Sequence, residues 1–119
     1  MGIRTYITAY KEVPNGEHCM GKTDLLDNWL SDNGCQRECG SLYDGYALLG
    51  EWERKELIKQ ITSVLKSKNK RKTFDKYFRE SDYYTDYEKW FDDELEMLKD
   101  LRDWLQTLDK DVWLFATQC

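Results

Sequence analysis

The sequence predicts an α+β domain in which a small sheet containing the N- and C-terminal strands is covered by three or four helices, one of them long and amphipathic. Two observations predict the sheet: residues 3–12 alternate between two unlike sets of side chains, and residues 111–118 are apolar on both faces, as in a buried strand. A third predicts the long helix, because apolar and aromatic residues recur at intervals of three and four over residues 83–108. A chain of 119 residues fits a single domain, 1–119.

The first third of the chain combines β-strand and helix signals. After residues 3–12, Val13-Pro14-Asn15-Gly16 predicts a chain reversal, because Pro presets φ and Asn-Gly tolerates positive φ. Residues 17–20 are a candidate second strand. Thr23 is a suitable N-cap for a short helix, and Asn33-Gly34 is a typical helix terminator.

The remainder is predicted to be mainly helical until the last strand. Residues 34–50 have the composition of a loop, with several Gly, Ser and Cys residues. Residues 51–67 place apolar residues on one side and charges on the other, which predicts a second helix. A third helical region opens near residue 72 or 73 and continues to 108, and the sequence leaves a break at Ser81-Asp82 open.

The sequence predicts a soluble, cytoplasmic protein. The N-terminus lacks an apolar signal segment, and no apolar run approaches the roughly 18–20 residues that span a bilayer, so we expect no membrane association. In a cytoplasmic protein the four cysteines are expected to be reduced thiols rather than a disulfide framework.

Charge is distributed unevenly along this chain of net charge −5. Residues 66–79 hold seven bases and one acid, a local charge of +6, whereas residues 80–103 hold ten acids and three bases, a local charge of −7. Such an asymmetry predicts either a charged partner or packing of the two segments against each other.

The acidic residues form a row that the helical period places mainly opposite the aromatic stripe. Ten acids over 24 residues give one charge per about 3.6 Å of helix, against about 1.7 Å for duplex DNA, so the row imitates nucleic acid only in part. The alternative is an ordinary solvated helix face. The predicted partner-binding residues are Glu80, Asp82, Asp86, Glu88, Asp92, Asp93, Glu96, Asp100 and Asp103.

The basic segment has an alternative role of its own. Its Lys and Arg residues could bind phosphates while Phe74, Tyr77 and Phe78 stack on bases. A sequence pI near 4.9 argues against direct nucleic-acid binding, so a solvated helix connection is favoured over a binding role for this segment. The alternative is that the segment binds a small nucleotide or signalling molecule. The predicted ligand-binding residues are Lys70, Arg71, Lys72, Tyr77 and Arg79.

Catalytic motifs are absent from the sequence. His18 is the single histidine and could form a Cys/His pair only with a distant cysteine, and there is no Gly-rich phosphate loop, G-x-S-x-G elbow or H-E-x-x-H pair. We therefore expect a protein that is not an enzyme and needs no cofactor.

A metal site is the remaining chemical alternative. Cys35 and Cys39 have the C-x₂₋₄-C spacing of zinc ligands and could combine with His18 or Cys19. Because the chain offers no second clear cysteine pair, two small thiols on a turn are favoured over a metal site.

Three pieces of the chain resemble a loose group of small phage-encoded proteins of unknown function. They are Met1-Gly2 leading into a strand with Tyr10 and Glu12, the segment of residues 43–50, and the terminal Asp111-Val112-Trp113-Leu114-Phe115. The residues between Gly2 and Tyr6 depart from the usual polar opening of that group. The resemblance implies origin in a phage or mobile element and carries no chemistry.

These observations together predict a non-enzymatic phage or mobile-element accessory protein. Its acidic helical surface would bind and inhibit a host nucleic-acid-handling or defence protein, in the manner of anti-CRISPR or antirestriction proteins. The partner would present a basic surface, on a nuclease or a defence complex. The alternatives are a protein that sequesters a nucleotide or signalling molecule between protomers of a homo-oligomer, and a structural component of an assembly.

Overall fold

The computed structural model describes residues 4–9, 16–22, 25–33, 37–38, 46–79, 87–109 and 112–118. In these ranges the chain forms five strands and four helices. The strands are β1 (Arg4–Ala9), β2 (Glu17–Lys22), β3 (Arg37–Glu38), β4 (Tyr46–Leu49) and β5 (Leu114–Gln118). The helices are α1 (Leu25–Asp32), α2 (Glu51–Lys66), α3 (Lys70–Tyr77) and α4 (Tyr87–Leu105). The predicted α+β class is confirmed.

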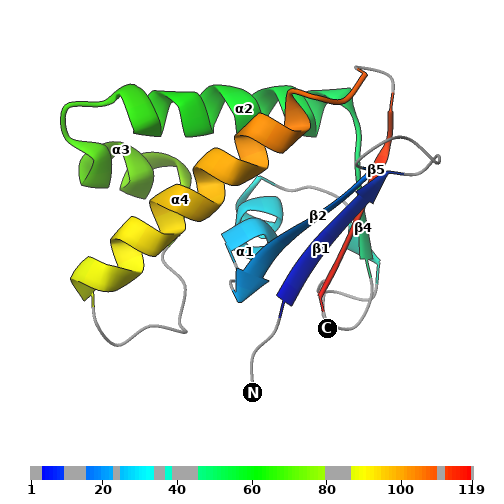
Figure 1. Cartoon of the computed structure of the whole chain (residues 1–119), viewed down its shortest axis with the longest axis horizontal. Coiled ribbons are helices and arrows are strands. Elements are labelled where there is room, and N and C mark those ends of the chain that lie inside the picture. The colour runs from blue at the N-terminus through cyan, green and yellow to red at the C-terminus, as the bar shows by residue number, and fades with distance from the viewer. Residues whose placement is uncertain are drawn as a thin grey trace.

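The strands form one antiparallel sheet with the order β2-β1-β5-β4-β3. The first strand lies beside the last, with Ile7 opposite Ala116 and Ala9 opposite Leu114 (Figure 1). The predicted pairing of the N- and C-terminal strands is therefore confirmed, and so is the candidate second strand over residues 17–20.

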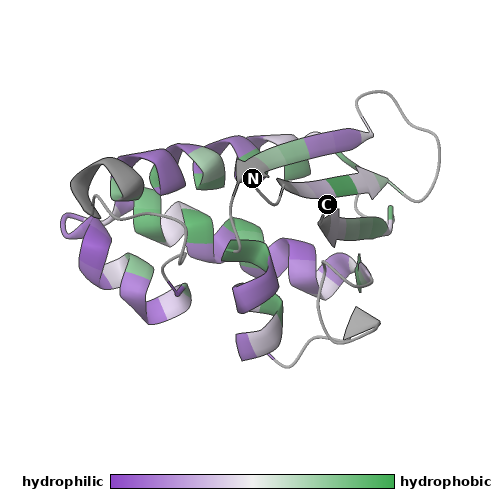
Figure 2. Ribbon diagram, turned by 90° about the horizontal axis from the view of Figure 1, so that it is seen from below, coloured by the Kyte–Doolittle hydropathy of each residue, from purple (hydrophilic) through white to green (hydrophobic). Residues whose placement is uncertain are grey.

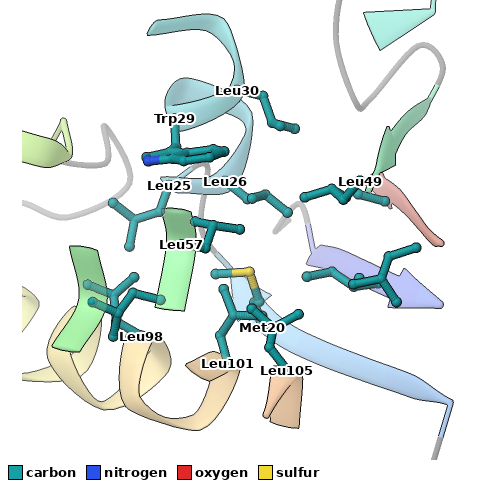
Figure 3. Close-up of a cluster of buried hydrophobic side chains, with 14 of the residues drawn as sticks. Met20, Leu25, Leu26, Trp29, Leu30, Leu49, Leu57, Leu98, Leu101 and Leu105 are labelled. Carbon is teal, nitrogen blue, oxygen red and sulfur yellow. The ribbon is translucent and has the colours of Figure 1, made fainter. Parts of the chain in front are cut away.

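The helices gather on one face of the sheet. Along β1 the side chains of Thr5, Ile7 and Ala9 are buried while Thr8 is exposed, so the predicted alternation separates an inner face from an outer one. Leucines of α1, α2 and α4 meet Met20 and Leu49 of the sheet in one cluster (Figure 3). This helix-on-sheet layer contains the core and is the expected solution for burying one face of each element.

The amphipathic pattern of the sequence orients the two longest helices. On α2 the buried apolar positions Leu57, Ile61 and Val64 follow intervals of three and four, and on α4 Leu98, Leu101 and Leu105 do the same. Figure 2 shows hydrophilic and hydrophobic stretches alternating along both helices, as this spacing requires. One face of each helix consequently remains available to solvent.

The predicted helical region from residue 72 or 73 to 108 is two helices. Helix α3 ends at Tyr77 because the following residue, Phe78, has an extended backbone (φ −129°, ψ 153°). Helix α4 spans Tyr87–Leu105 and so ends before the predicted residue 108, while residues 83–86 of the predicted helix lie outside the described residues. The break considered at Ser81-Asp82 lies outside the described residues.

The prediction of a loop over residues 34–50 is wrong for β3 and β4. Strand β4 lies inside the sheet, between β5 and β3, with Ala47 and Leu49 buried and Leu48 exposed. Its sequence is apolar on both faces and only four residues long, so it lacks the polar alternation that marks a half-buried strand. Strand β3 is two charged residues held by pairing to β4.

Candidate functional site

Four exposed carboxylates lie on one side of α4. Asp92, Glu96, Asp100 and Asp103 are all exposed, and with 3.6 residues per turn they share a narrow band of the helix surface. We call these four residues the acidic face. Three of them, Asp92, Glu96 and Asp100, follow one another at intervals of four, so each carboxylate stands one turn above the last.

The other members of the predicted row are placed differently or lie outside the described residues. Asp93 is half-buried at the border of the acidic face. Glu88 belongs to α4, but its side chain is outside the described part, as are Glu80, Asp82 and Asp86 altogether. Glu94, which interrupts the apolar stripe in the sequence, is fully buried.

Bases on α4 neutralise one end of the acidic face. Lys99 Nζ lies 3.8 Å from Asp103 Oδ2, and Arg102 Nη2 lies 3.0 Å from Asp103 Oδ1. Among the described residues no ion pair includes Asp92 or Glu96. The centre of the acidic face thus keeps its negative charge.

His18 connects this helix to the sheet. Its imidazole stacks on the indole of Trp104, with ring centroids 5.3 Å apart and planes inclined by 21°. Burial lowers the pKa of His18 below its ordinary 6.5, and the charge of Asp100 opposes that shift by favouring the protonated ring. The pKa of His18 therefore depends on the charge of Asp100, a member of the acidic face.

The basic segment makes its described ion pairs elsewhere. Arg71 Nε lies 3.0 Å from Asp75 Oδ2 within α3, and Arg79 Nε donates a hydrogen bond of 2.7 Å to Asp32 Oδ2 at the end of α1. The guanidinium of Arg71 also lies 5.6 Å from the centroid of the Phe91 ring. Neither of these two ion pairs includes a residue of the acidic face.

The aromatic residues of the basic segment are mostly internal. Phe74 is fully buried and meets Phe91 of α4 edge-to-face, with centroids 5.5 Å apart, and Phe78 is also buried. The expectation that Phe74 and Phe78 stack on bases is therefore wrong, because both rings are buried in the core, where they pack on each other with centroids 5.6 Å apart. Tyr77 is half-buried, and the ammonium of Lys76 lies 5.2 Å from its ring centroid.

A pocket of about 200 Å³ brings two predicted ligand-binding residues together. Tyr77 and Arg79 line it, whereas Lys70, Arg71 and Lys72 are not among its lining residues. Sequence reasoning missed its other polar groups, because Asp32 and Gln60 come from α1 and α2. Asp32 and Gln60 approach α3 through tertiary packing, and no local sequence motif predicts that contact.

Candidate metal clusters and membrane-spanning helices are both missing from the described residues. They contain no group of three or more His, Cys, Asp or Glu residues arranged to hold a metal ion. Cys19 is an exposed free thiol, and Cys35, Cys39 and Cys119 lie outside the described part. In the same ranges no helix combines the length and the apolar character needed to cross a bilayer.

No protein-family model matches the chain, and neither a curated protein nor a solved structure matches it.

Proposed function

We propose that this protein is a non-enzymatic binding protein whose acidic face docks on a basic surface of another protein. The observation that carries the proposal is the exposure of three successive carboxylates of the acidic face, Asp92, Glu96 and Asp100. Asp92 and Glu96 lack an ion pair within the described part of the chain, so their charge is available to a partner.

The arrangement lowers the stability of α4. Like charges at i,i+4 destabilise a helix by about 0.2–0.5 kcal/mol per pair, and Glu96 has such a neighbour on both sides. A basic partner would relieve this repulsion when it binds. Complementary charge would also accelerate encounter and make association sensitive to salt.

The proposed partner is a nuclease or defence complex with a basic groove, inhibited by occlusion of that groove. Origin in a phage or mobile element, implied by the resemblance of residues 43–50 and the terminal strand, is consistent with such an inhibitor acting in the host cytoplasm. Asp92, Glu96 and Asp100 stand four residues apart, about 6 Å along the helix, which supports local contact with basic side chains rather than full imitation of duplex DNA.

A comparison of charge-matched variants tests the proposal. The triple variant Asp92→Asn, Glu96→Gln, Asp100→Asn removes three charges from the acidic face. The control variant Glu17→Gln, Glu51→Gln, Asp109→Asn removes three exposed charges elsewhere. Each tagged protein is used to capture partners from a bacterial lysate at 50 and 200 mM salt, and the bound proteins are quantified by mass spectrometry.

We expect one basic protein to be retained by the wild type and by the control, and to be reduced at least tenfold with the acidic-face variant. Purified partner should then bind the wild type with an affinity that falls as salt rises. Equal recovery with all three proteins would remove the acidic face from the mechanism. Equal loss with both variants would show that net charge alone governs capture.

The pocket beside Tyr77 favours a second candidate, a protein that sequesters a small polar ligand. Its rim combines Arg79 and Lys76 with Asp32 and Asp75, and its volume of about 200 Å³ is below the roughly 300–1,000 Å³ of sites for drug-sized molecules. A nucleobase or a similar fragment suits it better than a whole nucleotide. A thermal-shift screen of bases, nucleosides and nucleotides tests this, since a ligand at 100 times its Kd stabilises by about 2.7 kcal/mol.

A further inference from the structure

A continuous basic region extends from the second half of α2 into α3. Residues 57–74 contain six bases and no acid, although the whole chain has a net charge of −5. Four of these bases are exposed lysines, Lys59, Lys66, Lys68 and Lys72. We call these four residues the basic corner: Lys66, Lys68 and Lys72 lie at or beside the turn that joins the two helices, and Lys59 lies two helical turns before Lys66 on the same side of α2.

The lysines of the basic corner do not pair with the carboxylates of the described residues. In the part of the chain that the structure describes, no ion pair joins any of its four lysines to an acid. Asp75 is the next acid along the chain, and its carboxylate pairs with Arg71. The positive charge of the corner therefore faces outward.

Side-chain hydrogen bonds fix the turn that carries these lysines. Ser67 Oγ donates to the carbonyl of Asn69 at 3.0 Å, and Thr73 Oγ1 donates to Ser67 Oγ at 2.7 Å. The Asn69 side chain accepts from the backbone N–H of Lys72 at 3.1 Å and so caps α3. The lysines are consequently held on a rigid corner rather than on a loose linker.

Helix α3 adds positive potential of the same sign. Its first turn contains Lys70, Arg71 and Lys72 and no acid, although a helix N-terminus favours anions. The sequence thus places bases where the helix dipole disfavours them, by about 0.3–1 kcal/mol for each exposed charge. An external anion at this corner would be attracted by the lysines and the dipole together.

We propose that the basic corner binds the phosphodiester backbone of nucleic acid without reading its sequence. Its side chains are of the types that contact phosphates, with Ser63 and Thr62 beside Lys59 and Lys66 on the same side of α2. Phe74 and Phe78, which could have stacked on bases, are buried in the core. Because the lysines are exposed and these two aromatic rings are buried, we expect the corner to contact the phosphate backbone and not the bases.

The net charge of −5 is the reason for which direct nucleic-acid binding was not expected from the sequence. Its repulsion of a phosphate bound at the basic corner is weak. At physiological ionic strength the Debye length is about 8 Å, so charges elsewhere on the surface are largely screened from a phosphate at the corner. Release of counterions from the nucleic acid supplies a driving force that pairs of exposed side chains lack. The inference is independent of the proposed role of the acidic face.

Fluorescence anisotropy with a labelled 20-base-pair DNA duplex tests the inference over 50–200 mM salt. Four phosphate contacts predict a slope of log K against log salt near −3.6, which is about a 150-fold loss of affinity over that range. Lys66→Gln with Lys68→Gln should reduce the slope to about −1.8, which is about a 12-fold loss. The acidic-face triple variant should bind the duplex at least as tightly as the wild type.

Matched controls separate the corner from net charge and from other polyanions. Lys55→Gln with Lys99→Gln removes two exposed lysines that already pair with acids, and it should leave the slope unchanged. Poly-glutamate of equal charge should compete at least tenfold less well than unlabelled duplex. The inference is overturned if the wild type does not bind the duplex at 50 mM salt, if both lysine variants behave alike, or if poly-glutamate competes equally.

Discussion

The indole N–H of Trp29 on α1 donates a hydrogen bond of 2.8 Å to the side-chain oxygen of Gln60 on α2. Trp29 is fully buried, and Gln60 lies at the edge of the core beside the pocket of Tyr77 and Arg79. A buried indole requires an acceptor, so this pair sets the position of α1 against α2.

Replacing Gln60 with Leu should therefore destabilise the protein by about 1–3 kcal/mol, because the indole N–H would be left buried without its acceptor. Urea unfolding followed by tryptophan fluorescence measures the loss. Gln106→Leu, an exposed change of the same chemistry, serves as the control and should have little effect. Similar losses in both variants would show that the hydrogen bond does not contribute.

Gly50 and Trp113 approach closely where β4 leads into α2. A Cβ added at Gly50 would lie 3.0 Å from two ring carbons of Trp113, although that indole is 53% exposed. Gly50 is also the N-cap of α2, a position where serine is otherwise favourable. The close approach of Trp113 thus favours glycine at residue 50, although helix capping alone would favour serine.

Gly50→Ser should destabilise the wild type, because the ring must move, yet stabilise a Trp113→Ala background by about 0.5–1 kcal/mol. A double-mutant cycle measured by urea unfolding gives the coupling between the two positions. If the serine has the same effect in both backgrounds, the ring does not restrict Gly50.

The burial of His18 makes stability depend on pH. Because burial lowers the pKa of His18 in the folded state, the unfolded chain binds the proton more tightly. The contribution of this residue is complete above the unfolded pKa of about 6.5 and decreases as pH falls below it toward the folded pKa. Unfolding curves at pH 7.5 and 5.5 should show lower stability at the acidic pH.

Two variants assign that dependence to His18. His18→Phe retains an aromatic ring against Trp104 and should reduce the loss between pH 7.5 and 5.5. Asp100→Asn removes the charge that favours protonation, so the pKa should fall further and the loss should increase. An unchanged pH dependence in His18→Phe would assign it to other groups.

The sequence predicted an element correctly where the period of its apolar side chains matches the positions that are buried in the structure. Residues Thr5, Ile7 and Ala9 revealed β1 because the sheet has one buried face, and α2 was revealed by the spacing of Leu57 and Ile61. Strand β4 was missed because Tyr46–Leu49 is apolar on both faces and its pairing to β5 is a long-range contact. Local pattern carries no signal for such a contact.

The same distinction applies to the candidate sites. The exposure of Asp92, Glu96 and Asp100 could be predicted, because helical period alone places them away from the apolar stripe. The approach of Arg79 to Asp32 could not, because 47 residues separate them. Charge runs therefore identify faces, while pockets depend on the tertiary fold.

Repulsion within the acidic face gives the last prediction. Glu96 stands one turn from Asp92 and one turn from Asp100, so Glu96→Lys converts two repulsive i,i+4 pairs into attractive ones. Allowing for the new proximity to Lys99, the free energy of unfolding should rise by about 1 kcal/mol at low salt. Chemical unfolding at 20 and 500 mM salt should show the gain shrinking as salt screens it.

Capture of the basic partner by Glu96→Lys should fall at the same time, because the substitution reverses the charge at the centre of the acidic face. Glu96→Gln should give about half the gain in stability, since it removes the repulsion without adding attraction. A sequence that keeps a less stable helix in exchange for a charged surface follows the usual opposition between stability and function. If Glu96→Lys is no more stable than the wild type at low salt, the three carboxylates do not repel one another and the case for an external basic partner loses its physical basis.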